Sequence, residues 1–305
     1  MEDSPNCFEN RSSRGTRGLG SRWYLDPSCF QFEQEKLFQH NWIPIGYESQ
    51  LKQTGDFFRF TLNEIDCIAV RDTSNVSRAF QNLCRHRGTQ LCTDPQGHAN
   101  SAMACPYHGW KYDFEGCLIV APNMQDVDGF DKEEFGLVEY PIKSWNGLLF
   151  VSLDNTAELP VTKLDPIAQL YGLAQYQREE TLSYDIEANW KLFFQNYNEC
   201  YHCPSVHPQL TPFSNYRESE NEFEHGEVLG GPMKIRDKVE TISEDGLACG
   251  AIPAGLPKTE LKKARYFSIF PNLFLSFFPD YVMVHRLTPI SKSRTRIECD
   301  LLFHP

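Results

Sequence analysis

The sequence predicts an α+β protein of two domains, the first built of β-strands and the second of a helix packed against an antiparallel sheet. Three observations support this fold class. The chain has 305 residues, which is enough for two hydrophobic cores. Short runs of β-forming residues, separated by turn residues, fill the stretch from about residue 40 to residue 155. A pattern with helical spacing near residue 190 is then followed by further β-type runs up to residue 303.

Composition narrows the class of protein further. The formal net charge of −12 argues against nucleic-acid binding, which needs a basic surface. No apolar run reaches the roughly 18 residues of a membrane span, and the N-terminus lacks the apolar core of a signal peptide. The 11 cysteines show no spacing typical of a disulfide framework. We therefore expect a soluble, cytoplasmic protein in which most cysteines are free thiols.

The N-terminal segment, residues 1–39, is predicted to be an arm followed by a helix. Residues 1 to about 20 are rich in Ser, Arg and Gly, which predicts a mobile arm. Apolar residues from Phe30 to Trp42 then recur near helical spacing. Pro44 is expected to stop this helix.

Short β-type runs define the first domain, which we place at residues 40–155. Turn residues separate the runs, and Glu115-Gly116 has the composition of a hairpin turn. The predicted strands are Asp56–Leu62, Asp66–Arg71, Val76–Asn82, the two arms of a hairpin within 110–120, and Leu148–Leu153.

Two short motifs in this domain each offer one thiolate and one imidazole. Cys84 and His86 form the first motif, and Cys105 and His108 form the second after 18 intervening residues. Replacing two thiolates on one iron of a [2Fe–2S] cluster by two neutral imidazoles raises the reduction potential and defines a Rieske centre. The motifs therefore favour a Rieske cluster bound by all four side chains.

A structural zinc ion is the alternative reading of these motifs. Four Cys and His side chains also form tetrahedral zinc sites, but zinc fingers pair Cys with Cys on one arm and His with His on the other. Here each arm combines both residue types. Gly88 and Gly109 further allow the backbone to approach closely and hydrogen-bond the sulfur atoms.

The second domain is expected at residues 156–305. Acidic residues and prolines within 154–166 predict the boundary, and a short helix at 167–176 and a strand at 181–186 follow. Further on, the β-type runs at 227–239, 266–270, 273–278, 281–287 and 294–303 could form a curved antiparallel sheet. Their aromatic residues line a substrate pocket or, more commonly for such side chains, the core: Phe267, Phe270, Phe274, Phe277, Phe278 and Tyr281.

A second group of candidate ligands follows the helical pattern that begins at Trp190. Glu199 and His202 are three residues apart and share a helix face. His207 would point about 140° away from His202 on an unbroken helix, so both can face one metal only if the backbone bends. Pro204 is expected to supply that bend. Two His and one carboxylate form the facial triad of non-haem Fe(II) oxygenases, although this spacing alone also fits core histidines or a zinc site with Cys200 and Cys203.

The first pair of motifs resembles the Rieske motif of the ring-hydroxylating oxygenase α-subunit family. The matching stretches run from Cys84 to Gly88 and from Cys105 to Trp110. Respiratory Rieske proteins have an additional disulfide whose cysteines correspond to Thr89 and Tyr107 here, which favours the oxygenase branch. The resemblance implies that Cys84, His86, Cys105 and His108 bind a [2Fe–2S] cluster.

The stretch from Asn198 to His207 resembles the mononuclear iron motif of the same family. By this resemblance His202 and His207 bind Fe(II), in a helix-grip (START-like) catalytic domain. Glu199 matches the acidic residue that bridges His202 to the cluster ligand of a neighbouring subunit. The family's third ligand, a carboxylate on a later helix, has no match, since Asp280 and Asp300 lie in β-type runs. We therefore expect a catalytic domain that is incomplete at its C-terminus.

The resemblance implies an oxidoreductase, the large subunit of a Rieske mono- or dioxygenase. A separate flavin or iron–sulfur reductase would pass electrons from NAD(P)H, and the subunit would form a homotrimer. The Glu-Cys-Tyr-His-Cys sequence is similar to that of the branch which oxidises N-methyl groups of amines, so a small N-methylated amine is the expected substrate. The alternatives are an arene-hydroxylating dioxygenase, an electron carrier with an incomplete catalytic domain, and a zinc-stabilised binding module.

Overall fold

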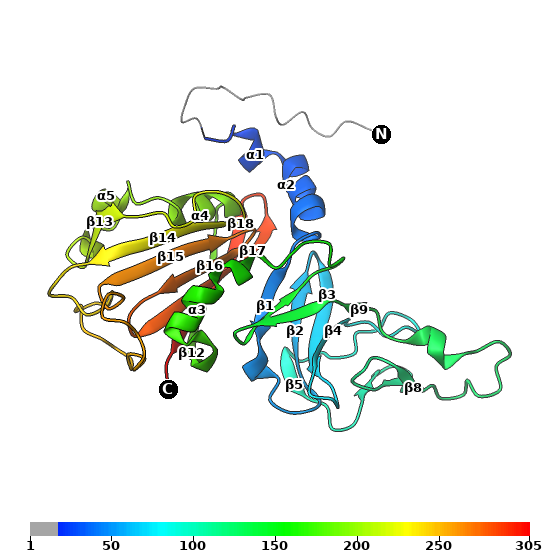
Figure 1. The fold of residues 1–305 in the computed structure, drawn as a ribbon. Coiled ribbons are helices and arrows are strands. Elements are labelled where there is room, and N and C mark those ends of the chain that lie inside the picture. The colour runs from blue at the N-terminus through cyan, green and yellow to red at the C-terminus, as the bar shows by residue number, and fades with distance from the viewer. Residues whose placement is uncertain (1–17) are drawn as a thin grey trace. The chain divides into compact units, whose positions relative to one another are not determined.

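A computed structural model of the chain describes residues 18–305, which form two compact units (Figure 1). One unit comprises residues 38–175, and the other comprises 176–305 together with the described N-terminal residues from 18 to 37. The sequence placed the first domain at 40–155, with the break within 154–166. The observed unit extends further because Asp165 accepts a hydrogen bond of 2.6 Å from the Trp145 indole. The predicted mobile arm lies almost entirely outside the described residues.

The N-terminal helices are shorter than the sequence suggested. Helix α1 spans Arg22–Leu25 and α2 spans Pro27–Glu33, and a π-helical turn then continues over Gln34–Phe38. The helix therefore ends at Phe38, so the prediction that it reaches Trp42 and stops at Pro44 was wrong. Pro44 lies inside strand β1, Ile43–Tyr47, which is an edge strand of its sheet and so tolerates a residue without an N–H.

Three small antiparallel sheets build the unit of residues 38–175. A five-stranded sheet has the order β5-β2-β3-β4-β9, with β5 Gln96–His98, β2 Asp56–Leu62, β3 Ile65–Arg71, β4 Ser77–Gln81 and β9 Glu139–Tyr140. A second sheet pairs β1 with β11, Leu148–Val151, and β10, Ile142–Trp145. The third contains β6 Met103–Ala104, β7 Lys111–Tyr112 and β8 Leu118–Val120. The unit also contains short helical segments: Glu48–Gln50, Lys132–Phe135, Pro160–Leu164, α3 Asp165–Tyr171 and Leu173–Gln175.

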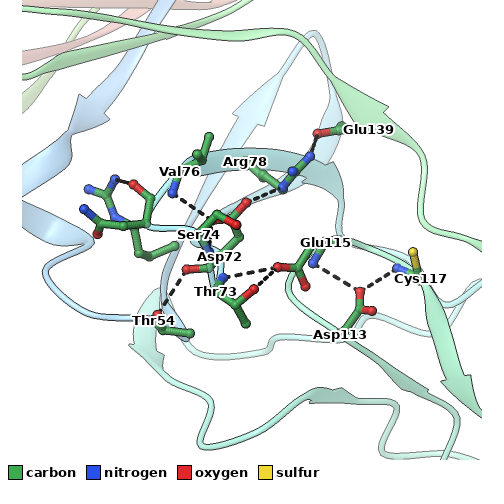
Figure 2. A network of polar contacts seen from close by, with 12 residues as sticks. Thr54, Asp72, Thr73, Ser74, Val76, Arg78, Asp113, Glu115, Cys117 and Glu139 are labelled. Atoms are coloured by element: carbon green, nitrogen blue, oxygen red, sulfur yellow. Dashed lines mark hydrogen bonds and ion pairs between the residues drawn. The ribbon is translucent and has the colours of Figure 1, made fainter.

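A polar network joins the β3–β4 turn to the β7–β8 turn (Figure 2). The Asp72 carboxylate is fully buried and accepts hydrogen bonds from the backbone N–H groups of Ser74 and Val76 and from Arg78. Glu115 of the β7–β8 turn accepts the hydroxyl and backbone N–H of Thr73. Burial alone would raise the pKa of Asp72, but these donors outweigh it and hold that pKa below its ordinary value.

A seven-stranded antiparallel sheet forms most of the other unit. Its order is β12-β18-β17-β16-β15-β14-β13, with β12 Gln177–Ile186, β18 Arg294–Phe303, β17 Tyr281–Ser291, β16 Leu273–Phe277, β15 Lys263–Ile269, β14 Val228–Ile235 and β13 Ser214–Ser219. Helix α4, Trp190–Tyr197, packs on one face of this sheet, where the Phe193 and Phe194 rings lie 5.0 and 5.5 Å from the Phe274 ring (Figure 1). This arrangement confirms the predicted α+β class.

Candidate functional site

The loops that carry the two Cys and His motifs have the same backbone hydrogen bonds. In the first loop, Cys84 N–H donates to Thr89 C=O at 2.8 Å, and Gly88 N–H donates to Cys84 C=O at 2.8 Å. In the second loop, Cys105 N–H donates to Trp110 C=O at 2.7 Å and Gly109 N–H to Cys105 C=O at 3.1 Å. The two glycines have φ of +68° and +72°, a conformation that other residues rarely adopt. Each loop is thus a closed turn of the same shape.

The four candidate cluster ligands lie together at the ends of these turns. The Cys84 and Cys105 side chains are buried, and the Cys84 thiol is close enough to Cys105 for the two to interact electrostatically. The His86 and His108 ring centroids are 4.7 Å apart, and His86 stacks on the Trp110 indole at 4.8 Å. The loops therefore bring the two sulfur atoms near each other and the two imidazoles near each other.

Several features of this group fit an iron–sulfur cluster. The Nδ1 atom of His86 is buried and has no hydrogen-bond partner, as expected for an atom that binds a metal. Burial lowers the pKa of His86, which favours the neutral imidazole that binds a metal. The Tyr112 hydroxyl lies 3.4 Å from Cys84 Sγ, where it can donate a hydrogen bond to a cluster thiolate, and it accepts the backbone N–H of Arg85 at 3.0 Å.

The way the candidate ligands are grouped in space also helps to decide between a zinc ion and an iron–sulfur cluster. Among residues 18–305, no three His, Cys, Asp or Glu side chains converge on a point from which they could hold one metal ion. A tetrahedral zinc site would need such a group. Each iron of a Rieske cluster takes only two protein ligands, so this geometry favours the cluster.

The segment with Glu199, His202 and His207 is not a continuous helix. Helix α4 ends at Tyr197, and a separate short helix, α5, spans Cys203–Val206, with a 3-10 turn at Pro208–Leu210 after it. His202 and His207 are the residues that flank α5 on either side. The chain therefore bends before His202, and the prediction that Pro204 supplies the bend was wrong, because Pro204 lies in the first turn of α5, where proline is well tolerated.

The predicted side chains nevertheless lie close together. Nδ1 of His202 lies 3.0 Å from Oε1 of Glu199, and Asn196 Nδ2 lies 3.2 Å from Nε2 of His202. A carboxylate only accepts and an amide NH2 only donates, so both contacts favour the tautomer with a proton on Nδ1 and a lone pair on Nε2. The His202 and His207 ring centroids are 5.3 Å apart. The two imidazoles could therefore share one metal ion.

A cavity of about 510 Å³ adjoins both histidines. Its wall includes the aromatic residues Tyr197, Tyr216, Phe223 and Tyr266 and the carboxylates Glu199, Glu220 and Glu224. None of the six aromatic residues proposed from the sequence lines it. Phe267, Phe274, Phe277, Phe278 and Tyr281 belong to the buried core instead. Tyr266 was missed, although it lies on the same face of β15 as Ser268, whose hydroxyl donates to Asn198 at the end of α4.

Neither Asp280 nor Asp300 lies at the cavity wall. Asp300 on β18 forms an ion pair of 3.0 Å with Arg286 and accepts the Thr181 hydroxyl. Asp280 accepts the backbone N–H groups of Cys249 and Gly250. Both carboxylates thus have structural partners, which agrees with leaving the third-ligand role unassigned.

Two family profiles match the chain in the order in which these sites occur. The profile described as "Rieske [2Fe-2S] domain" matches residues 41–137. The profile described as "Ring hydroxylating alpha subunit (catalytic domain)" matches residues 173–305. The cluster loops lie in the first match, and Glu199, His202 and His207 lie in the second.

Curated relatives include oxygenase subunits that act on quaternary amines. The glycine betaine monooxygenase oxygenase subunit of Chromohalobacter salexigens is 28% identical over 96% of this chain and 73% of its own length. The carnitine monooxygenase oxygenase subunit of Escherichia coli (strain K12) is 33% identical over 62% of this chain and 52% of its own length. The chain thus spans about three quarters of the first relative and about half of the second.

Solved structures show the same fold. A quaternary ammonium Rieske monooxygenase in complex with L-carnitine superposes with a TM-score of 0.75 at 23% identity, over 93% of this chain and 75% of that one. Naphthalene 1,2-dioxygenase from Rhodococcus gives a TM-score of 0.74 at 22% identity, over 93% of this chain and 72% of the other. The chain therefore contains a Rieske [2Fe-2S] domain followed by the catalytic domain of ring-hydroxylating α-subunits.

Proposed function

We propose that this chain is the oxygenase subunit of a Rieske monooxygenase that oxidises a small N-methylated amine. The observation that supports this most directly is the cavity beside His202 and His207, whose lining residues include four aromatic side chains and three carboxylates. Aromatic faces attract a quaternary ammonium group through cation–π contacts, and carboxylates add a favourable field for a cation. The names of the glycine betaine and carnitine relatives point to the same substrate class.

We assign roles to the site residues from the family resemblance, and their contacts support these roles. Cys84, Cys105, His86 and His108 hold the [2Fe–2S] cluster, and His202 and His207 hold Fe(II). When bound, the cluster supplies single electrons and the iron activates O2. Glu199 accepts the hydrogen bond from the protonated Nδ1 of His202, so that Nε2 is the ring atom that would bind the iron. In a homotrimer, the same carboxylate would also reach His108 of a neighbouring copy, so that the electron path crosses between subunits.

Turnover with defined substrates tests this function. With an NAD(P)H-dependent reductase, the chain consumes O2 when glycine betaine, carnitine or choline is present. Two electrons, two protons and one O2 hydroxylate one N-methyl C–H bond and form one water, and the hydroxymethyl amine then releases formaldehyde. A chain that responds to naphthalene and to none of the amines would instead be an arene dioxygenase.

Replacing Glu199 by Gln tests the proposed electron path. The amide keeps the shape of the side chain but loses its charge, so product formation falls by about ten- to a hundredfold. Reduction of the cluster by the reductase stays unchanged, because the cluster ligands are intact. Undiminished turnover of the Glu199→Gln variant would exclude the bridging role.

An electron carrier with an inactive second site is the competing function. It is favoured by one observation: no carboxylate among residues 18–305 completes a three-ligand group with His202 and His207. Iron and acid-labile sulfide per chain distinguish the two functions. An occupied second site gives about three iron per two sulfide, and the cluster alone gives about two per two.

A further inference from the structure

Helix α2 contacts the helix that leads into the candidate iron site through a buried carboxylate. Glu33 is 2% exposed, and it accepts two hydrogen bonds from Lys191 Nζ, at 2.6 and 2.8 Å. It also accepts the indole N–H of Trp190 at 2.9 Å. Lys191 and Trp190 form the first turn of α4 and are themselves buried. One carboxylate from α2 thus fixes two successive residues of α4.

Tyr24, in the N-terminal segment, also contacts α4 and the residue that caps it. Asn189 caps α4 by accepting the Lys191 backbone N–H at 3.1 Å. Its amide donates to the Lys292 C=O at 2.8 Å and to the Tyr24 C=O at 3.3 Å. Gln195 on the same helix donates to the Tyr24 hydroxyl at 2.6 Å. The segment from Tyr24 to Glu33 therefore contacts α4 along its length.

The other end of α4 leads directly to the candidate ligands. The Tyr197 hydroxyl lies 2.7 Å from Ser276 Oγ, and Asn198 accepts the Ser268 hydroxyl at 2.7 Å, so this end is held by the sheet. Glu199 follows immediately. An eight-residue helix is only about 12 Å long and behaves as a rigid rod. A rotation at its first turn therefore acts on the contacts that Tyr197 and Asn198 make with the sheet, and through them on Glu199.

A buried ion pair contributes little net free energy to holding a helix in place. Desolvation of both charges offsets most of their attraction, and apolar residues of similar size often stabilise a protein equally well. A buried carboxylate with three directed donors does, however, specify one orientation of the helix, because any rotation leaves a charge unpaired. The Glu33 contact is of this kind.

We propose that Glu33 is a positioning residue for the candidate iron site, acting through Lys191 and Trp190 on α4. The N-terminal segment then helps to position the candidate iron ligands. It belongs to the same compact unit as residues 176–305. The inference rests on the proposed assignment of His202 and His207 as metal ligands.

Co2+ binding to chain freed of mononuclear iron, measured by calorimetry, tests the inference without turnover. Glu33→Gln weakens Co2+ binding by about tenfold, the loss typical when a residue that orients a ligand is changed. Lys191→Met weakens it similarly, and the double variant is no worse than either single one, because both remove the same interaction. The visible circular dichroism of the cluster stays unchanged in each variant, because its ligands lie in the unit of residues 38–175.

Arg22→Gln is the matched control. It breaks an exposed ion pair of 3.1 Å with Asp26 on the same segment and leaves Co2+ affinity unchanged. If Glu33→Gln lowers the melting temperature but binds Co2+ as the unaltered chain does, Glu33 is only an anchor and the inference is wrong. Should Glu33→Gln not fold, Trp190→Phe keeps the ion pair and removes one hydrogen bond. It must then bind Co2+ more weakly, and unchanged affinity would overturn the inference.

The unaltered chain and His202→Ala show which assignment has failed. If His202→Ala binds Co2+ as well as the unaltered chain, the ligand assignment itself is wrong. If only His202→Ala loses binding, the ligand assignment stands and the positioning role of Glu33 is excluded.

Discussion

The two candidate metal sites are built in opposite ways. Each cluster loop closes on itself through two backbone hydrogen bonds and carries its ligands within four residues. His202 and His207 instead flank a four-residue helix, and the side chains that contact the His202 ring come from the end of α4 and from the turn that follows it. A site made of closed turns is specified by local sequence. A site made at a break between helices depends on whatever holds those helices, so distant changes affect it more.

The largest expected effect is the loss of one site without the other. Cys84→Ser removes a thiolate that the cluster needs, so we expect acid-labile sulfide and the visible absorption of the cluster to disappear. Co2+ binding at His202 and His207 should persist in this variant, since these residues lie in the other unit. His202→Ala should show the reverse pattern. Loss of both sites in either variant would mean that they are not independently built.

The unit that holds the cluster should depend strongly on one buried carboxylate. Asp72→Ala leaves two part-buried backbone N–H groups without their acceptor and leaves Arg78 paired with Glu139 alone (Figure 2), which costs about 2–3 kcal/mol of unfolding free energy. Urea unfolding followed by cluster absorbance measures this. Thr73→Val is the control, because it removes only an exposed contact with Glu115. Equal midpoints for the two variants would contradict the expected role of the network.

The unfolding free energy of the unit that contains His202 and His207 should instead depend on pH, through a third histidine, His285. Burial between α4 and the sheet lowers the pKa of His285 to about 4, although Asp300 raises it slightly, and its Nδ1 has no partner. In the unfolded chain this pKa is about 6.5, so between pH 6.5 and 4 the unfolded state binds more protons and stability falls as pH falls. The expected loss between pH 7 and pH 5 is about 2 kcal/mol.

Replacing the histidine tests this pH dependence. His285→Leu should flatten the stability curve between pH 5 and pH 7, as measured by chemical unfolding at each pH. His225→Gln changes an exposed histidine in the same unit and should leave the curve unaltered. A curve that is equally steep in His285→Leu would assign the pH dependence to other groups.

The smallest expected effect concerns the tuning of the cluster. Tyr112→Phe removes the hydroxyl beside Cys84 Sγ, and a hydrogen bond to a cluster sulfur favours the reduced, more negative state. The loss of about 1 kcal/mol corresponds to a potential lower by about 40 mV for one electron. Spectroelectrochemical titration measures it. An unchanged potential would mean that this hydroxyl does not donate to the thiolate.

The sequence predicted long, strongly patterned elements well. Strands β2 and β18 were predicted with the observed bounds, because alternating side chains and flanking turn residues mark both ends. Strands of two or three residues, such as β5 and β6, are too short to show a period, and β13 is too polar. These strands form because they pair with strands that are distant in the sequence. A local sequence pattern carries no information about such pairing.

The same distinction applies to the candidate sites. The four candidate cluster ligands could be named from spacing alone, because each motif occupies one turn. The break after Tyr197 was missed, although Asn198 ends α4 and asparagine is common at helix ends. The cavity wall was also missed, because it combines residues from α4, β14 and β15, which come together only in the folded sheet.

The closed shape of the cluster loops has a consequence for how the metal centre is assembled. The backbone of each loop is already satisfied by its own hydrogen bonds, and a glycine at each turn holds the left-handed conformation. Cluster insertion then orders very few additional dihedral angles, so most of the entropy cost is met when the chain folds. Folded chain stripped of its cluster should consequently accept iron and sulfide again without unfolding, unlike small zinc domains, whose fold forms only when the metal binds.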